Sequence, residues 1–296
     1  MTTPISDAGL RPRRSVLYMP GANTRALEKA KGLNADSLIL DLEDAVSPDA
    51  KSEARDNVCN AVGSGGYGNR ELTIRVNGLG TQWHDDDIRA ASQAGPGAIV
   101  VPKVNSVDDV KRIEEAMAAA NAPAHTKLWA MLETPIAIRD AFAIAESGER
   151  LTVFVMGTND LLKELRAQSI PGRGPLVHAL STCVTAARAA GRSILDGVFN
   201  AIDDADGFTS ECAQGAAFGF DGKTLIHPSQ LDAANAAFAP SEAEVTYGRR
   251  VITAFDEALA LGKGVATVDG KMIENLHVAN AQRAIAMAEA IEAMRA

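Results

Sequence analysis

The segment SLILDLEDAVSP, residues 37–48, contains one complete strand-to-helix transition and sets the pattern for the whole chain. The run Ser37–Asp41 is almost continuously apolar, as expected of a strand that is covered on both faces. Acidic residues follow directly at Glu43 and Asp44. Ser47-Pro48 then offers a helix N-cap with a proline in the first turn. The segment therefore predicts a buried strand, an acidic loop at its carboxyl end and a helix.

Similar apolar runs recur along the chain, with amphipathic patterns between most neighbours. The runs are Ser15–Pro20, Ser37–Asp41, Glu71–Asn77, Gly97–Pro102, Lys127–Glu133, Thr152–Gly157, Ser193–Phe199 and Gly219–Ile226. Eight parallel strands with intervening helices close a TIM-type (β/α)8 barrel of about 250 residues. A doubly wound open sheet is the alternative, but it would need a reason to stop short of closure. We therefore predict an α/β fold of the (β/α)8 barrel type.

The barrel does not use the whole chain. We assign residues 12–235 to a (β/α)8 catalytic domain and residues 236–296 to a C-terminal helical extension. Ser241-Glu242-Ala243-Glu244 fits a capping box that begins a long helix. A glycine-bearing connection and a final helix from about Met272 to Met294 follow. We expect this extension to act as a lid or as a subunit contact.

The composition excludes several classes of protein. The chain has 296 residues with a formal net charge of −9, and an acidic surface repels the phosphate backbone of nucleic acids. No stretch reaches the roughly 20 apolar residues of a membrane span. Three sparse cysteines offer neither a disulfide framework nor metal-ligand spacing. We expect a cytoplasmic protein that binds small molecules, without nucleic-acid or membrane partners.

Two acidic residues at neighbouring strand ends suggest a metal site. Glu133 ends the fifth run and Asp160 follows the sixth, so both lie at the rim where such barrels carry their chemistry. Two carboxylates that face one cavity without a cation would raise each other's pKa, and a divalent ion removes that cost. An all-oxygen pair suits Mg²⁺, with Mn²⁺ as a substitute. The alternative is that either carboxylate caps the following helix.

A basic residue lies at the end of the third run. Arg75 could hold a substrate carboxylate through two parallel hydrogen bonds. The alternative is an ion pair with Asp41, Glu43 or Asp44, and one guanidinium could do both. The histidines are isolated from one another in the sequence, and His227 is the best candidate among them for a functional role.

Seven motifs at these strand ends carry a family resemblance, in order over about residues 12–295. They are Arg14–Gly21, Leu40–Val46, Ile74–Gly78, Val101–Lys103, Leu132–Pro135, Gly157–Leu161 and Gly222–Gln230. With them the chain resembles the citrate lyase β-subunit-like family of the HpcH/HpaI aldolase superfamily, which includes malyl-CoA and citramalyl-CoA lyases. The combination is specific for the family and much less specific for the substrate.

The resemblance implies a Mg²⁺-dependent barrel enzyme that acts on 3-hydroxyacyl thioesters such as malyl-, citramalyl- or citryl-CoA. Such an enzyme is a carbon–carbon lyase that releases acetyl-CoA and a 2-oxo acid, or runs the condensation. The alternative is a (3S)-malyl-CoA thioesterase-type hydrolase on the same barrel. A barrel that only binds coenzyme A is a third, non-enzymatic interpretation. The family also implies homotrimers, or hexamers built as dimers of trimers.

The resemblance also implies roles for individual residues. Glu133 and Asp160 correspond to the metal ligands, and Arg75 to the clamp for the oxo acid. Glu43, with Asp44, would orient Arg75 or a metal-bound water. The positions implied for coenzyme A are Tyr18, Arg25, Lys29, Ile226, His227 and Pro228.

One position departs from the family pattern. Malyl- and citramalyl-CoA lyases carry a catalytic Asp after a Met-Ile pair in the C-terminal segment, whereas this chain has Glu274 after Met272-Ile273. The longer side chain could keep the acid–base function, favour water over the oxo acid, or change the substrate. The alternative is that Glu274 is an acidic residue on a helix surface.

Overall fold

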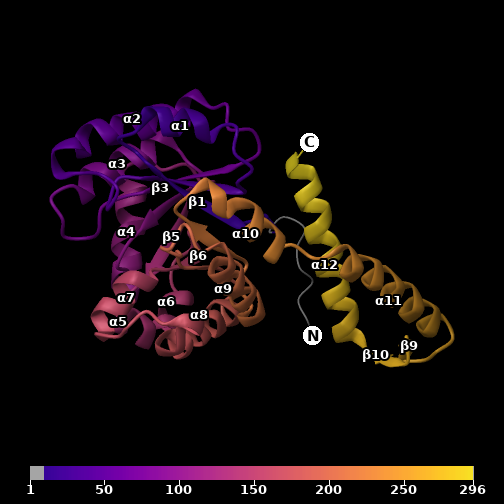
Figure 1. Ribbon diagram of the computed structural model, residues 1–296. Helices are drawn as coiled ribbons and strands as arrows, with labels where there is room; N and C mark the ends of the chain where they lie inside the picture. Colours follow the sequence, from indigo (N-terminus) through magenta and orange to yellow (C-terminus); the bar gives the residue numbers. More distant parts are fainter. Residues whose placement is uncertain (1–9, 296) are drawn as a thin grey trace. The chain divides into compact units, whose positions relative to one another are not determined.

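The computed structural model describes residues 10–295 and contains, within them, a closed barrel of eight parallel strands (Figure 1). Each strand pairs with the next, and β8 closes the ring against β1, with Leu17 opposite Leu225. The strands are β1 (Ser15–Pro20), β2 (Ser37–Asp41), β3 (Glu71–Arg75), β4 (Ala98–Val101), β5 (Lys127–Leu132), β6 (Leu151–Met156), β7 (Ser193–Asp196) and β8 (Gly222–Leu225). The predicted barrel is confirmed, and the β1–β8 pairing excludes an open sheet.

Several strands are shorter than the apolar runs that predict them. The run Ser193–Phe199 continues three residues beyond β7, and the run Gly219–Ile226 begins three residues before β8. The extra apolar residues belong to loops in which Phe199 is half-buried and Phe220 is buried. Phe199 packs against Phe208 with 5.8 Å between ring centroids, and Phe220 is 5% exposed. Burial makes a loop residue resemble a strand residue in sequence, so the runs overestimate strand length.

Helices surround the barrel and connect its strands (Figure 1). They are α1 (Thr24–Ala30), α2 (Lys51–Ser64), α3 (His84–Ala94), α4 (Val107–Ala119), α5 (Pro135–Arg139), α6 (Ala141–Ala145), α7 (Thr158–Leu165), α8 (Val177–Ala189), α9 (Ala205–Phe218) and α10 (Leu231–Ala237), with short 3₁₀ turns η2 (Pro48–Ala50), η3 (Pro171–Leu176) and η4 (Pro228–Gln230). Thr134 caps α5, as its Oγ1 accepts the N–H of Ala137 at 3.1 Å. After β2, Ser47 is the N-cap residue of η2 and Pro48 lies in its first turn, but the Ser47 side chain makes no capping hydrogen bond, and η2 leads directly into α2.

The alternation of side chains along the strands places polar side chains at the carboxyl ends of the strands, which form the polar rim of the barrel. Apolar side chains fill the barrel interior, and the buried members of this cluster are Val16, Ile39, Ala98, Val100, Trp129, Met131, Val153, Val155 and Leu195. Successive side chains of a strand point to opposite faces. Two residues beyond Val16, Ile39 and Met131, the same inward face carries Tyr18, Asp41 and Glu133. The barrel interior therefore changes from apolar to charged at its carboxyl end.

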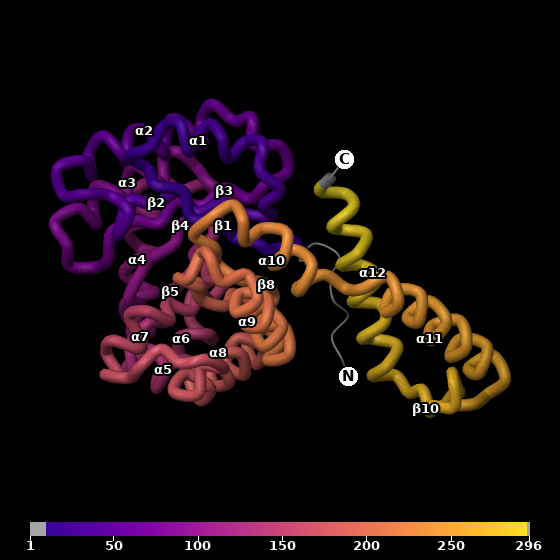
Figure 2. Tube along the Cα trace, in the orientation of Figure 1, coloured from indigo at the N-terminus to yellow at the C-terminus, as the bar shows by residue number. Residues whose placement is uncertain are grey.

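The chain divides into two compact units, Arg13–Phe238 and a unit formed mainly by Ala239–Ala296. In the second unit α11 (Glu242–Ala260) and α12 (Asn275–Arg295) lie side by side (Figure 2). Ser241 and Glu244 form the predicted capping box of α11. No helix within residues 10–295 is long and apolar enough to cross a bilayer.

The prediction of a final helix from about Met272 was wrong at its beginning. Lys271–Ile273 form β10, which pairs antiparallel with β9 (Ala266–Val268), and α12 begins at Asn275. The turn between the strands is Asp269-Gly270, and both residues have positive φ. Glycine adopts this conformation readily, so the glycine here marks a hairpin turn rather than a helix connection.

Candidate functional site

The polar rim encloses a cavity of about 200 Å³ at the carboxyl ends of the barrel strands. The side chains come from several strand ends around the ring, and the charged or polar lining residues include Tyr18, Asp41, Asp44, Arg75, Glu133, Asn159, Asp160, Asn200 and Thr224. The cavity is smaller than the roughly 300–1,000 Å³ of a site for a drug-sized ligand. It therefore admits a small acyl group or the reactive end of a larger molecule.

Arg75 is buried at the end of β3, and each of its three guanidinium nitrogens faces a carboxylate. Nε and Nη2 donate to the two oxygens of Asp41 at 2.6 and 2.7 Å, and Nη1 lies 2.8 Å from Glu43 Oε2. The guanidinium also lies 4.7 Å from the centroid of the Tyr18 ring. Burial is the largest single effect and opposes the charged form, but Asp41, Tyr18 and Glu43 together outweigh it, so the pKa of Arg75 is raised. The alternative interpretation of Arg75, an ion pair with the acids that follow β2, is thus observed with Asp41 and Glu43. The role of Arg75 as a substrate clamp stays a prediction.

Glu43 has the properties of a group that can exchange a proton near neutral pH. Burial raises its pKa to about 7, against the effect of Arg75 and with a further rise from Asp44 and Asp41. Asp44 lies beside it on the same loop with its side chain 71% exposed, and its Oδ2 is 3.5 Å from Arg75 Nη1. The predicted pair is therefore brought to Arg75, with Glu43 half-buried and Asp44 in contact with solvent.

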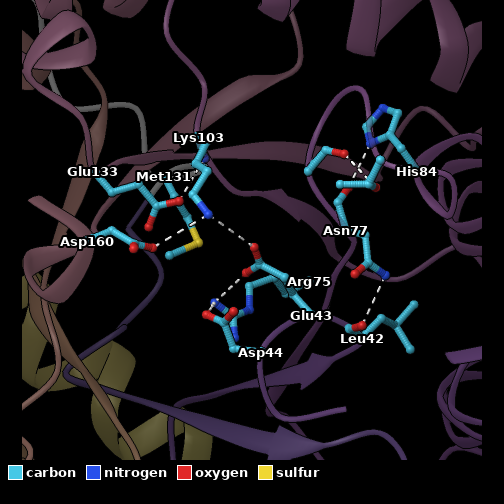
Figure 3. A network of polar contacts seen from close by, with 12 residues as sticks. Leu42, Glu43, Asp44, Arg75, Asn77, His84, Lys103, Met131, Glu133 and Asp160 are labelled. Atoms are coloured by element: carbon cyan, nitrogen blue, oxygen red, sulfur yellow. Dashed lines mark hydrogen bonds and ion pairs between the residues drawn. The ribbon is translucent and has the colours of Figure 1, made fainter. Parts of the chain in front are cut away.

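Glu133 and Asp160 meet around Lys103 (Figure 3). Glu133 Oε1 accepts the backbone N–H of Lys103 at 2.8 Å, and Asp160 Oδ2 lies 3.7 Å from Lys103 Nζ. Burial, followed by the charges of Glu43 and Asp160, raises the pKa of Glu133 to about 7. Within the described chain no side chain caps the N-terminus of α7, so the capping role considered for Asp160 is not observed. Both carboxylates instead face the cavity.

This donor set fits a hard divalent cation. In the part of the chain that the structure describes, no group of three His, Cys, Asp or Glu side chains forms a complete metal cage. The protein would contribute Glu133 and Asp160, with water and ligand oxygens at the other positions, which is the arrangement that Mg²⁺ prefers. Burial and, after it, the charges of Glu43 and Asp160 raise the pKa of Glu133, and a bound cation would favour the charged form against both effects.

The residues predicted to contact coenzyme A lie in different settings. Tyr18 and Ile226 line the cavity. His227 caps η4, since its Nδ1 accepts the N–H of Ser229 at 3.2 Å, and Pro228 is the first residue of that turn. Arg25 and Lys29 are exposed one turn apart on α1. Their contacts with a ligand stay predictions.

Glu274 lies in the second unit, between β10 and α12. Its carbonyl oxygen accepts the N–H of His277 at 2.9 Å, and its own N–H donates to His277 Nδ1 at 3.1 Å. These backbone bonds hold Glu274 at the start of a helix and leave its carboxylate available. Its predicted acid–base role stays a prediction.

Two supporting residues had no role predicted from the sequence, although Gly157 lies in one of the family motifs. Lys51 is buried on α2, where its Nζ donates to the carbonyl oxygens of Leu42 and Glu43 at 2.7 Å each and to Asn77 Oδ1 at 2.8 Å, which holds the acidic loop in place. Gly157 lies against Glu133, and a Cβ at this position would overlap the Glu133 side chain. The contacts of Lys51 span 8 to 26 residues and that of Gly157 with Glu133 spans 24, so neither leaves a periodic pattern along the chain.

Gly157→Ala is expected to weaken Mg²⁺ binding at least tenfold, because the new methyl group displaces the Glu133 carboxylate. Overpacking at such a contact costs about 1–3 kcal/mol, so the barrel should still fold. Calorimetric titration with Mg²⁺ and a thermal melt measure the two effects. Gly63→Ala is the matched control, since Gly63 lies exposed on α2 with no atom near the added Cβ. Unchanged metal binding in Gly157→Ala would contradict the placement of Glu133 as a ligand.

Comparisons with known proteins agree with this architecture. Residues 14–228 match the family model described as HpcH/HpaI aldolase/citrate lyase. A (3S)-malyl-CoA thioesterase from Cereibacter sphaeroides is 49% identical over 285 residues, which cover 96% of this chain and 98% of that protein. Citrate lyase subunit beta from Escherichia coli is 34% identical over 284 residues, which cover 94% of each protein.

A solved structure shares the fold over nearly the whole chain. The protein CitE from Mycobacterium tuberculosis, in complex with magnesium, acetoacetate and coenzyme A, superposes with a TM-score of 0.76 at 27% identity. The match covers 97% of this chain and 99% of that one. The likeness therefore includes both compact units.

Proposed function

We propose, since the chain belongs to the HpcH/HpaI aldolase/citrate lyase family, that it is a Mg²⁺-dependent thioesterase of a short 3-hydroxyacyl-CoA such as (3S)-malyl-CoA. One observation carries the proposal, the cavity that gathers Glu133, Asp160 and Arg75 at the barrel rim. The choice of hydrolysis is supported by the relative that is 49% identical over almost its full length. This reverses the order of the two activities expected from the motifs, in which the lyase came first.

Glu133 and Asp160 would hold the ion, which supplies a Lewis acid that polarises an oxygen of the bound acyl group. Arg75 lines the same cavity, and its charge is paired with Asp41 and Glu43. Its place in the cavity suits it to face the free carboxylate of the acyl group. Tyr18 covers one face of the guanidinium and limits its movement.

Hydrolysis joins the oxygen of water to the thioester carbonyl carbon and breaks the carbon–sulfur bond. One proton of the water goes to the departing thiolate. Glu43, with a pKa of about 7, would take that proton first, and Asp44 beside it connects the site to solvent.

Glu274 would act as the second acid–base group if a neighbouring subunit brings its second unit to the cavity. A homotrimer or hexamer supplies such a neighbour, and light scattering measures that state.

Carbon–carbon cleavage is the second candidate, because citrate lyase subunit beta aligns with this chain over 94% of both proteins. In that reaction the bond between the hydroxyl-bearing carbon and the methylene carbon breaks. The products are a 2-oxo acid and acetyl-CoA. The same carboxylates and Arg75 would serve both reactions, so the products distinguish them.

The test is a product assay with (3S)-malyl-CoA and Mg²⁺. We expect free CoA and malate in equal amounts, with the thiol detected by a colorimetric reagent and malate by chromatography. Release of acetyl-CoA and glyoxylate instead would favour the lyase. If malyl-, citramalyl- and citryl-CoA all yield neither pair of products, both activities are contradicted. That result would favour a barrel that only binds coenzyme A.

A further inference from the structure

Lys103 is a second basic residue at the site, beside the proposed metal ligands. It follows β4 and has a φ of 54°, which is costly for a residue with a Cβ. In this conformation its backbone N–H donates to Glu133 Oε1 at 2.8 Å. A single residue thus contacts one carboxylate of the site through its main chain and reaches the other through its side chain.

The ammonium group of Lys103 lies between Asp160 and Glu43 and makes a close contact with neither carboxylate. Its Nζ lies 3.7 Å from Asp160 Oδ2 and 4.0 Å from Glu43 Oε1 (Figure 3). Both distances exceed that of a hydrogen bond. The side chain is 49% exposed, so it can leave this position without opening the core. Arg75 differs, since it is buried with three close contacts to Asp41 and Glu43.

Arg75 and Lys103 therefore make different contacts at the site. Arg75 is paired with Asp41 at the end of β2 and with Glu43 on the following loop. Lys103 is the cation closest to Asp160 among the described contacts and balances the charge that Glu133 and Asp160 bring to the cavity. A divalent ion on these carboxylates would share Asp160 with the Lys103 ammonium, which now lies 3.7 Å from Oδ2.

We propose that Lys103 is the counter-cation of the metal-free site and competes with the divalent ion for Asp160. The inference rests on the proposed function in one respect, that Glu133 and Asp160 are the metal ligands. When the ion binds, the ammonium moves away from Asp160 toward solvent or the ligand. Lys103 is thus a positioning residue that keeps two carboxylates close together before the metal arrives and lowers metal affinity as a result.

The physical reason is that like charges near one oxygen repel, while two unbalanced carboxylates attract a cation more strongly. Removing the ammonium group should therefore tighten metal binding, whereas removing a true ligand weakens it. Lys103→Met keeps the length of the side chain, the left-handed backbone and the N–H bond to Glu133. Lys103→Gln gives a second neutral side chain, and Lys103→Arg keeps the charge.

The experiment is a titration of the metal-free full chain with Mn²⁺, without substrate, in which free Mn²⁺ is measured by electron paramagnetic resonance. We expect Lys103→Met and Lys103→Gln to lower the Kd for Mn²⁺ about five- to tenfold, and Lys103→Arg to stay within twofold of the native chain. Lys111→Met is the matched control for loss of one positive charge, because Lys111 is exposed on α4 and pairs with Asp108 at 3.8 Å. It should leave the Kd unchanged.

Two other results have separate meanings. An unchanged or higher Kd in both neutral Lys103 variants would overturn the competition and leave the metal site standing. Native Mn²⁺ affinity in Glu133→Gln and Asp160→Asn would instead overturn the metal site, and with it the premise of the proposed function. The two failures are distinguishable because they concern different variants in the same titration.

Discussion

Glu133→Gln is expected to lower kcat for thioester hydrolysis by about 10³-fold or more, because the site loses a metal ligand and its electrostatic stabilisation. Glutamine keeps the volume of the side chain, and its amide oxygen can still accept the N–H of Lys103, which now lies 2.8 Å from Glu133 Oε1. The loss should therefore come from charge and coordination. Initial rates at saturating Mg²⁺ measure it, alongside calorimetric titration with Mg²⁺.

The same variant should not lose stability in the absence of metal. Burial raises the pKa of Glu133 from 4.5 to about 7, so the folded state holds this proton more tightly than the unfolded state. Between those two values stability falls as pH rises, since folding must bury a charge that the unfolded chain keeps in water. Glu133→Gln removes that cost, and at pH 8 the metal-free variant should melt at the native temperature or above it.

Glu115→Gln is a matched control, since Glu115 is an exposed acid on α4. It should change neither activity nor metal binding. Full Mg²⁺-dependent activity in Glu133→Gln would remove Glu133 from the mechanism. A large drop in melting temperature would mean that Glu133 acts mainly in folding.

Arg75→Met is expected to lower the free energy of unfolding by about 3–5 kcal/mol, which is the typical cost of leaving a buried charge without its partner. Asp41 is 1% exposed and now receives two hydrogen bonds from Arg75 at 2.6 and 2.7 Å. Methionine would fill the space of the arginine stem but supply no donor. Urea unfolding of the metal-free protein measures the change.

A double-mutant cycle isolates the pair. Asp41→Asn removes the charge that Arg75→Met leaves unpaired, so the combined variant should lose clearly less than the sum of the two single losses. Arg89→Met is the exposed control, because Arg89 pairs with Asp86 on the surface of α3 and such pairs contribute about 1 kcal/mol or less. Additive losses in the cycle would contradict a specific ion pair between Arg75 and Asp41.

Local patterns were sufficient to predict the barrel. Apolar runs and helix starts such as Thr134-Pro135 act over a few residues, and eight repeats of them specify closure. The carboxyl ends of parallel strands meet at one rim, so the positions of Arg75 and Glu133 at strand ends also predicted that they line one cavity. The hairpin at Lys271–Ile273 was missed because three-residue strands leave too short a pattern.

The sequence by itself therefore determined the barrel and the set of residues at its rim, because both follow from the order of residues along each strand. Only the tertiary structure decided how those residues share their charges. Three features depend on distances between side chains of different strands and on the exclusion of water around them. They are the ion pair of Arg75 with Asp41, the position of Lys103 beside Asp160 and the raised pKa of Glu133. Burial and Coulomb interactions act through space, and their strength is set only when the ring of strands has closed.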